Sequence, residues 1–177
     1  NPFPYNFDVS HFSKDIVDSF DSFSEEDEVA VAGRIMAQRK MGKASFCTIL
    51  DNEGKIQLYI GEKKIGAELY ELFKKCDIGD IVGVKGNVKK TKTGEISIFA
   101  NSFELLTKNI RPLPIVKEKD GEVFDAFSDK ELRYRNRHVD LIVSAGVKDT
   151  FKKRIAILKN VKEILFAKDF LEVETPI

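Results

Sequence analysis

Apolar residues recur at every second position over several short stretches between residues 28 and 110. In the first of these, 28–38, Val29, Val31 and Ile35 fall on one face of an extended chain, which is typical of a half-buried β-strand. The same period predicts four further strands, over 44–50, 55–60, 81–88 and 96–103. Turns at 41–43, 51–54 and 92–94 join neighbouring strands.

One helix interrupts this run of strands. Ile65, Leu69 and Leu72 fall at helical spacing within 64–75, between the third and fourth strands. Three strands, a helix and two strands form the element order of an OB-fold, a small five-stranded β-barrel that commonly binds oligonucleotides. Other small β-rich folds share parts of this order, so the pattern alone leaves them open. The barrel with its added helices belongs to the α+β class.

The segments on either side of the barrel have helical patterns. A short helix around Phe12, Ile16 and Phe20 has Ser10 as its predicted cap, and the prolines of 111–114 mark a linker. Asp129 is the predicted cap of a helix that runs to residue 141, followed by a longer helix over 148–168 and a strand over 170–173. We therefore expect an N-terminal extension with a helix (1–27), the barrel (28–110), a linker (111–128) and the start of a second domain (129–177).

Composition places the chain among soluble globular proteins. Of its 177 residues, 42% are hydrophobic and 33% are charged. No stretch approaches the ~18 apolar residues of a membrane-spanning helix, so we expect no membrane partner. The net charge is zero, but 1–28 carries one lysine and eight acidic residues, whereas 29–110 carries 14 basic and nine acidic residues. The basic middle segment indicates an anionic partner.

Two cysteines, Cys47 and Cys76, are too few for a disulfide scaffold in a chain of this size, which favours the reducing cytoplasm. His11 and His138 lack metal-ligand spacing, so no metal site is expected. The sequence starts at Asn1 without a signal peptide and stops after Ile177 without a polar tail. We therefore expect a fragment of a longer protein.

Strand alternation predicts an open face that suits single-stranded RNA or DNA. It carries Phe46, Gln57, Tyr59 and Phe99, and three lysines border it: Lys43, Lys55 and Lys92. Aromatic rings stack on bases, amides hydrogen-bond to base edges and lysines neutralise phosphates. A shift of one residue in the alternation would instead place both phenylalanines in the barrel core.

Several motifs along the chain resemble one family. Residues 31–46, 90–98, 105–108 and 111–114 are similar to the barrel strands and linker of lysyl-tRNA synthetase of the bacterial type. Residues 131–141 resemble the helix that leads into the catalytic domain of that family. Residues 170–176 resemble motif 1 of the class II synthetases, and the opening residues 1–4 also fit.

The resemblance implies that the barrel binds a tRNA anticodon. Phe46 and Gln57 match the family positions that hold the middle anticodon base, a uridine. Glu95 matches an acidic residue that reads a neighbouring base, and Arg39 is our choice for a basic residue near the end of the first strand. Alternation places Gln38 rather than Arg39 on the open face unless a β-bulge intervenes. Lys43, Lys55 and Lys92 are expected to contact the tRNA backbone.

The resemblance also implies a homodimer, because motif 1 builds the dimer interface of the family and Pro176 matches its proline. Motifs 2 and 3, which contact ATP, would lie beyond Ile177. We therefore expect this fragment to hold no catalytic residue, no metal and no cofactor, while the parent enzyme uses ATP and Mg²⁺ to attach lysine to its tRNA through lysyl-adenylate. The alternatives are a non-catalytic OB-fold protein that binds single strands, and the aspartate or asparagine relative.

Overall fold

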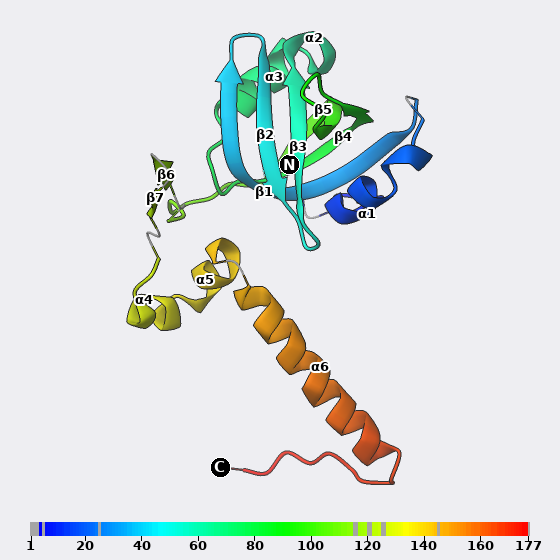
Figure 1. The fold of residues 1–177 in the computed structure, drawn as a ribbon, viewed down its shortest axis with the longest axis vertical. Helices are drawn as coiled ribbons and strands as arrows, with labels where there is room; N and C mark the ends of the chain where they lie inside the picture. The colour runs from blue at the N-terminus through cyan, green and yellow to red at the C-terminus, as the bar shows by residue number, and fades with distance from the viewer. Residues whose placement is uncertain are drawn as a thin grey trace. The chain divides into compact units, whose positions relative to one another are not determined.

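The computed structural model describes residue 4 and residues 6–24, 26–114, 117–119, 122–124, 127–144 and 146–176. The chain divides into two compact units, Asn1–Leu113 and Pro114–Ile177. The first unit is built around a closed β-barrel (Figure 1). The described part of the second unit holds a two-stranded sheet and three helices. Residues 115–116, 120–121 and 125–126 of the predicted linker lie outside the described residues.

The five predicted strands are present in the first unit and close into a barrel with the order β1-β2-β3-β5-β4. All neighbouring strands are antiparallel except β3 and β5, which are parallel. The barrel that the element order predicted is therefore confirmed. The strand bounds are β1 Glu28–Met41, β2 Ala44–Leu50, β3 Lys55–Gly61, β4 Ile81–Lys90 and β5 Ile96–Thr107.

The inward-facing residues of these strands fill the barrel. Ile35, Ile49, Leu58, Val84 and Ile98 are fully buried. Ile35, Ile49 and Leu58 each lie between less buried neighbours on their strands, which is the alternation of a sheet with one dry face. The apolar interior thus fixes which side chains are left on the outer face.

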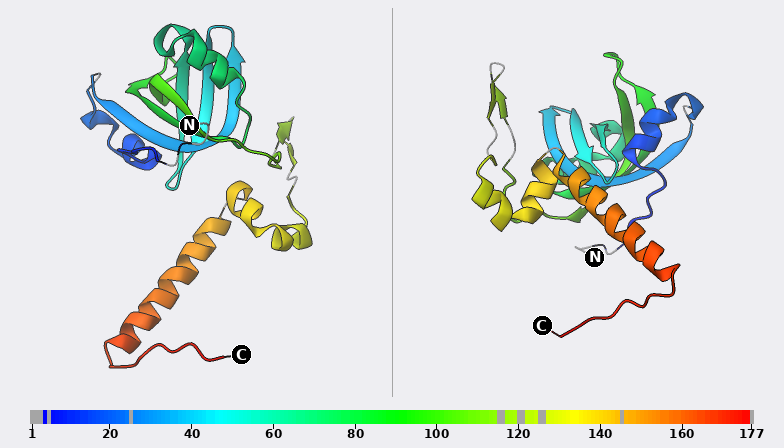
Figure 2. Two further views of the ribbon diagram at one scale, coloured as in Figure 1. Left: turned by 180° about the vertical axis from the view of Figure 1, so that it is seen from behind. Right: turned by 60° about the horizontal axis from the view of Figure 1, so that its bottom comes forward.

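The predicted helix over 64–75 is two helices, α2 Glu62–Ile65 and α3 Ala67–Lys74. The break is at Gly66, whose φ of 87° is in the left-handed region that glycine adopts most easily. The two helices lie at one end of the barrel, as the rear view in Figure 2 shows. Tyr70 of α3 is buried there, and its hydroxyl donates to the backbone oxygen of Gly42 in the β1–β2 turn over 2.8 Å.

The N-terminal segment packs against the barrel through α1 Ser13–Asp18, followed by the 3₁₀ turn η1 Phe20–Ser22. The prediction that Ser10 caps this helix is wrong. The Ser10 hydroxyl instead accepts from the backbone N–H of Ala30 on β1 over 2.8 Å, so a tertiary partner takes the oxygen that a cap would use. Ser13 donates to Asp51 from its backbone N–H over 2.5 Å and from its hydroxyl over 2.8 Å.

The second unit departs further from its predicted elements. Its helices are α4 Lys130–Arg135, α5 Arg137–Val143 and α6 Val147–Phe166, and its strands are β6 Lys117–Lys119 and β7 Glu122–Phe124. Asp129 caps α4 as predicted, since its side chain accepts from the N–H of Leu132. The single helix expected to run to residue 141 is broken at Asn136. The strand expected over 170–173 is absent, because a strand needs a hydrogen-bonding neighbour and this segment has none in the described residues.

Candidate nucleic-acid interface

A β-bulge in β1 decides which of its residues reach the outer face of the barrel. The register with β2 shifts between Ile35 and Ala37. Beyond the shift, Arg39 lies opposite Phe46, and Gln38 lies opposite the buried Cys47. Because directly opposed residues share a face, the bulge places Arg39 on the side that simple alternation assigns to Gln38.

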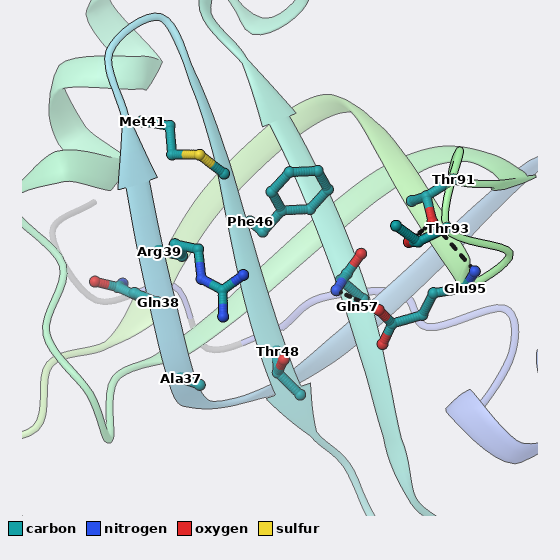
Figure 3. Close-up of a pocket in the computed structure, with 10 residues that line it drawn as sticks. All are labelled: Ala37, Gln38, Arg39, Met41, Phe46, Thr48, Gln57, Thr91, Thr93 and Glu95. Carbon is teal, nitrogen blue, oxygen red and sulfur yellow. Dashed lines mark hydrogen bonds between the residues drawn. The ribbon is translucent and has the colours of Figure 1, made fainter.

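The outer face of β1, β2 and β3 is hollowed by a cavity of about 350 Å³. The side chains of Arg39, Phe46, Gln57 and Glu95 converge on it from three strands and the β4–β5 turn (Figure 3). Sequence reasoning proposed these four residues as one group, and the structure brings them together. The remaining lining residues are Ala37, Gln38, Met41, Thr48, Thr91 and Thr93.

Phe46 is one of three aromatic residues that form a row across the outer face. The Phe46 and Tyr59 rings meet edge to face at 5.4 Å, and the Tyr59 and Phe99 rings lie 4.8 Å apart. All three are half-buried, whereas the neighbouring Cys47 and Ile98 are fully buried. The predicted alternation is therefore correct, and neither phenylalanine belongs to the core.

Gln57 is held at both ends of its amide. Its Nε2 donates to a Glu95 carboxylate oxygen over 2.8 Å, and its Oε1 accepts from the Ser97 hydroxyl over 2.9 Å. Ser97 is fully buried and lies opposite Gln57 in the parallel β3–β5 pair. The amide therefore has a defined position before any ligand arrives.

The β4–β5 turn presents Glu95 to the cavity. The Thr91 hydroxyl lies 2.9 Å from that of Thr93 and accepts from the backbone N–H of Glu95 over 3.1 Å. Gly94, with a φ of 86°, completes the turn. Sequence reasoning gave neither threonine a role. The Lys-Thr-Lys-Thr-Gly-Glu segment was visible as a family motif, but its side-chain contacts depend on the turn geometry.

The three lysines assigned to the tRNA backbone are exposed but do not form a single cluster. Lys43 is in the β1–β2 turn, Lys55 begins β3 and Lys92 is in the β4–β5 turn. Leu50 pairs with Lys55 and Ala44 with Gly61, so Lys43 and Lys55 lie at opposite ends of the β2–β3 pair. The positive charge is thus spread along the face.

Helix α6 and the segment after it carry a row of apolar side chains that solvent reaches. Ile157 is 63% exposed, Leu165 41% and Leu171 86%. Pro176 lies at the end of this segment and is also exposed. A hollow of about 330 Å³ opens between α6 and the segment, lined mainly by Leu158, Val161, Leu165, Phe166, Phe170 and Leu171.

A buried carboxylate holds α4 and α5 together. Asp140 is fully buried and accepts from Arg133 over 2.8 Å, from Ser144 over 2.6 Å and from Arg137. Burial opposes ionisation of Asp140, but the hydrogen bonds from Ser144 and Arg133, together with the positive charges of Arg133 and Arg137, outweigh burial and hold the pKa of Asp140 below its usual range. Two of the arginines in this part of the chain thus have a structural partner.

Other candidate chemistry is weak in the described residues. Burial raises the pKa of Cys47 to about 12 and that of Cys76 to about 11, so both thiols are protonated and poorly nucleophilic at neutral pH. Across the ranges that the structure describes, no three His, Cys, Asp or Glu side chains are grouped to hold a metal ion. No helix in this part of the chain has the length and apolar character needed to span a membrane.

Comparison with known families matches both units. Residues 29–106 match the model of the OB-fold nucleic acid binding domain, and residues 129–177 match that of the class II tRNA synthetases for D, K and N. A lysine–tRNA ligase of Carboxydothermus hydrogenoformans is 48% identical over 175 residues, which is 99% of this chain and 34% of that protein. A lysine–tRNA ligase of Azobacteroides pseudotrichonymphae is 48% identical over 184 residues, which is 100% of this chain and 37% of that protein.

The chain belongs to the lysyl-tRNA synthetase family. Both family models match it in the expected order, with the OB-fold domain before the class II domain. The class II model covers the aspartate, lysine and asparagine enzymes together, so the choice of lysine rests on the two ligases. The chain spans 34% and 37% of their lengths. A general single-strand binder, the alternative considered from sequence, does not explain the match at 129–177.

Proposed function

We propose that this chain is the anticodon-binding part of an enzyme that attaches lysine to its tRNA. The observation that carries the proposal is the convergence of Arg39, Phe46, Gln57 and Glu95 on one cavity of an OB-fold barrel. An aromatic ring, an amide, a cation and an anion at one hollow suit the splayed bases of an RNA loop. A site built only for backbone charge would need neither the ring nor the amide.

Each residue receives a role from its chemistry. Phe46 stacks on the middle anticodon uridine, since its ring is half-buried and lines the cavity. Gln57 hydrogen-bonds to the edge of that base. Arg39, brought to the face by the bulge, binds the loop from the β1 side, and Glu95 contacts a neighbouring base. Lys43, Lys55 and Lys92 neutralise phosphates along the face.

The test is a titration of the chain with three RNA hairpins at one fixed salt concentration. The first carries the lysine anticodon loop, the second has its middle uridine changed to cytidine, and the third carries the asparagine anticodon. We expect the first to bind about tenfold or more tightly than the second, because a good pair of base-edge hydrogen bonds discriminates by roughly 1–3 kcal/mol. Equal, salt-sensitive binding of all three would leave only a backbone-binding barrel.

For the whole enzyme we propose the reaction of the family, in which ATP activates lysine as lysyl-adenylate before lysine passes to the tRNA. Bound Mg²⁺ would stabilise charge on the phosphates in the first step. This chain contributes to the reaction through its contacts with the tRNA. Its contribution is binding energy and discrimination far from the reacting atoms. The free, buried cysteines favour the cytoplasm as its location.

We also propose that the apolar side of α6 and the segment ending at Pro176 form the homodimer interface. The support is the exposed row that includes Ile157, Leu165 and Leu171, because exposed apolar patches of this kind mark protein contacts. Leu165→Lys should shift the chain toward monomer in sedimentation velocity. An exposed substitution on the same helix, Lys159→Ala, is the control and should leave the distribution unchanged.

A further inference from the structure

The amide of Gln57 has one fixed orientation in the structure. Its Nε2 faces the Glu95 carboxylate and its Oε1 faces the Ser97 hydroxyl. A primary amide has two N–H donors and two acceptor lone pairs. After these two bonds, one N–H donor on the Glu95 side and one oxygen lone pair on the Ser97 side remain for a ligand.

This orientation matters because an amide can read either pyrimidine. Uracil presents an N3–H donor beside the O4 acceptor, whereas cytosine presents an N3 acceptor beside the N4 amino donor. An amide that pairs with uracil through Oε1 and Nε2 pairs equally well with cytosine once it turns by 180°. Gln57 alone therefore cannot tell the two bases apart, and discrimination requires something that prevents the turn.

Glu95 is the group that can prevent it. An ionised carboxylate only accepts hydrogen bonds, so a turned amide would bring Oε1 against the Glu95 oxygens. The Ser97 hydroxyl cannot do this alone, because it both donates and accepts. Its oxygen also lies 3.4 Å from the backbone oxygen of Glu95, which offers the hydroxyl another acceptor if Gln57 turns.

We propose that Glu95 is a positioning residue that sets the polarity of the Gln57 amide and thereby makes the site select uridine over cytidine, with Ser97 supporting that orientation. The proposal rests on the proposed function, in which Gln57 contacts the middle anticodon base. It gives Glu95 a role beyond contact with a neighbouring base. The carboxylate oxygen that accepts from Gln57 is Oε2, and this role requires no contact between Glu95 and RNA.

The test compares wild-type and Glu95→Gln chains with the uridine and cytidine hairpins. A glutamine at 95 both donates and accepts, so it permits both orientations of Gln57. We expect the preference for uridine to fall from about tenfold to about threefold or less, partly through tighter binding of the cytidine hairpin. A gain for cytidine is decisive, because damage to the fold cannot strengthen binding.

Two further variants isolate the effect. Glu104→Gln removes one negative charge from an exposed position on β5, outside the cavity lining, and should leave the ratio of the two affinities at the wild-type value. Ser97→Ala removes the supporting donor and should lower the ratio by less than Glu95→Gln does. Thermal unfolding of each variant shows whether the barrel remains intact.

The outcomes separate this proposal from the one on which it rests. If the wild-type chain does not prefer uridine, the proposed anticodon function fails and this inference fails with it. If the wild-type chain prefers uridine and Glu95→Gln keeps the full preference, only the inference is overturned. The inference is also overturned if Glu95→Gln changes the affinity only for hairpins in which a base next to the middle base has been substituted. Glu95 would then read that neighbouring base.

Discussion

Apolar side chains are buried in the barrel but largely exposed along helix α6 of the second unit. In the barrel, residues such as Leu58 and Ile98 are fully buried inside a sheet that closes on itself. Helix α6 contains no buried residue, and Ile155 and Ile157 on it are more than 60% exposed. The same hydrophobic driving force is thus satisfied within the barrel and unsatisfied along α6.

The contrast indicates that the barrel is stable on its own, whereas α6 needs a partner surface. A closed barrel has no free strand edge and can present a precise outer face without help. A helix with an exposed apolar side reaches its full stability only when another surface covers it. We therefore expect RNA recognition to depend on the barrel alone, and α6 to depend on a partner surface.

The largest expected effect compares one leucine from each region. Leu58→Ala should reduce the free energy of unfolding by about 2–5 kcal/mol, because it empties part of a sealed core. Leu158→Ala, at a side chain that is 52% exposed, should change it by less than about 1 kcal/mol. Urea denaturation followed by circular dichroism measures both. Equal losses would show that α6 is packed as firmly as the barrel.

The next effect concerns the outer face of the barrel. Phe46→Ala should weaken binding of the lysine anticodon hairpin by about 1–3 kcal/mol through loss of one stacked base. The stability loss should be smaller than that of Leu58→Ala, since the Phe46 ring is only half-buried. Isothermal titration and thermal unfolding provide the two numbers. A stability loss as large as that of Leu58→Ala would make Phe46 a core residue.

Acidic pH should lower the stability of both units, because each contains one buried or half-buried aspartate whose ionised form stabilises the fold. Burial opposes ionisation of Asp51, but hydrogen bonds from Ser13, Gly54 and Glu53 together outweigh burial and hold the pKa of Asp51 below its usual range. The pKa of Asp140 is lowered as well. A carboxyl group whose pKa is lower in the folded than in the unfolded state stabilises the fold at pH values above its unfolded pKa. This stabilisation is lost as the pH falls through the folded-state pKa.

Asp51→Asn and Asp140→Asn should therefore be less stable than the wild-type chain at pH 7, with the gap narrowing as the pH falls from about 5. Unfolding free energies measured between pH 7 and pH 3 give the comparison. A gap that stays constant over this range would show that neither charge is linked to folding.

The smallest expected effect is that of single lysines on the face. Lys92→Ala should weaken the uridine and cytidine hairpins equally, by about threefold or less, and reduce the slope of log affinity against log salt by roughly 0.7–0.9. Titrations at three salt concentrations measure both. A change in the uridine preference would mean that Lys92 contacts a base.

Alternation predicted the five strands and favoured an outer position for Phe46 and Gln57, while the order of strands and helix, together with the family resemblance, pointed to the barrel. Alternation could not decide between Gln38 and Arg39, because that depends on a bulge whose extra residue leaves no mark in the apolar pattern. The break at Gly66 was also missed, since the flanking residues keep helical spacing across it.

The contacts of Gln57 lay beyond sequence reasoning for a different reason. Ser97 and Glu95 are about 40 residues away in the sequence, and only the parallel pairing of β3 with β5 brings them to the amide. The strand predicted at 170–173 is absent because the described residues give this segment no pairing neighbour. Pairing between distant segments is the information that local patterns lack.

The most direct test of anticodon reading by the barrel is a thermodynamic cycle between Gln57 and the middle base. Wild-type and Gln57→Ala chains are each titrated with the uridine and cytidine hairpins at one salt concentration. We predict a coupling energy of about 1–3 kcal/mol, because the substitution removes the hydrogen bonds that distinguish the two bases. Additive effects within about 0.5 kcal/mol would contradict base reading by Gln57.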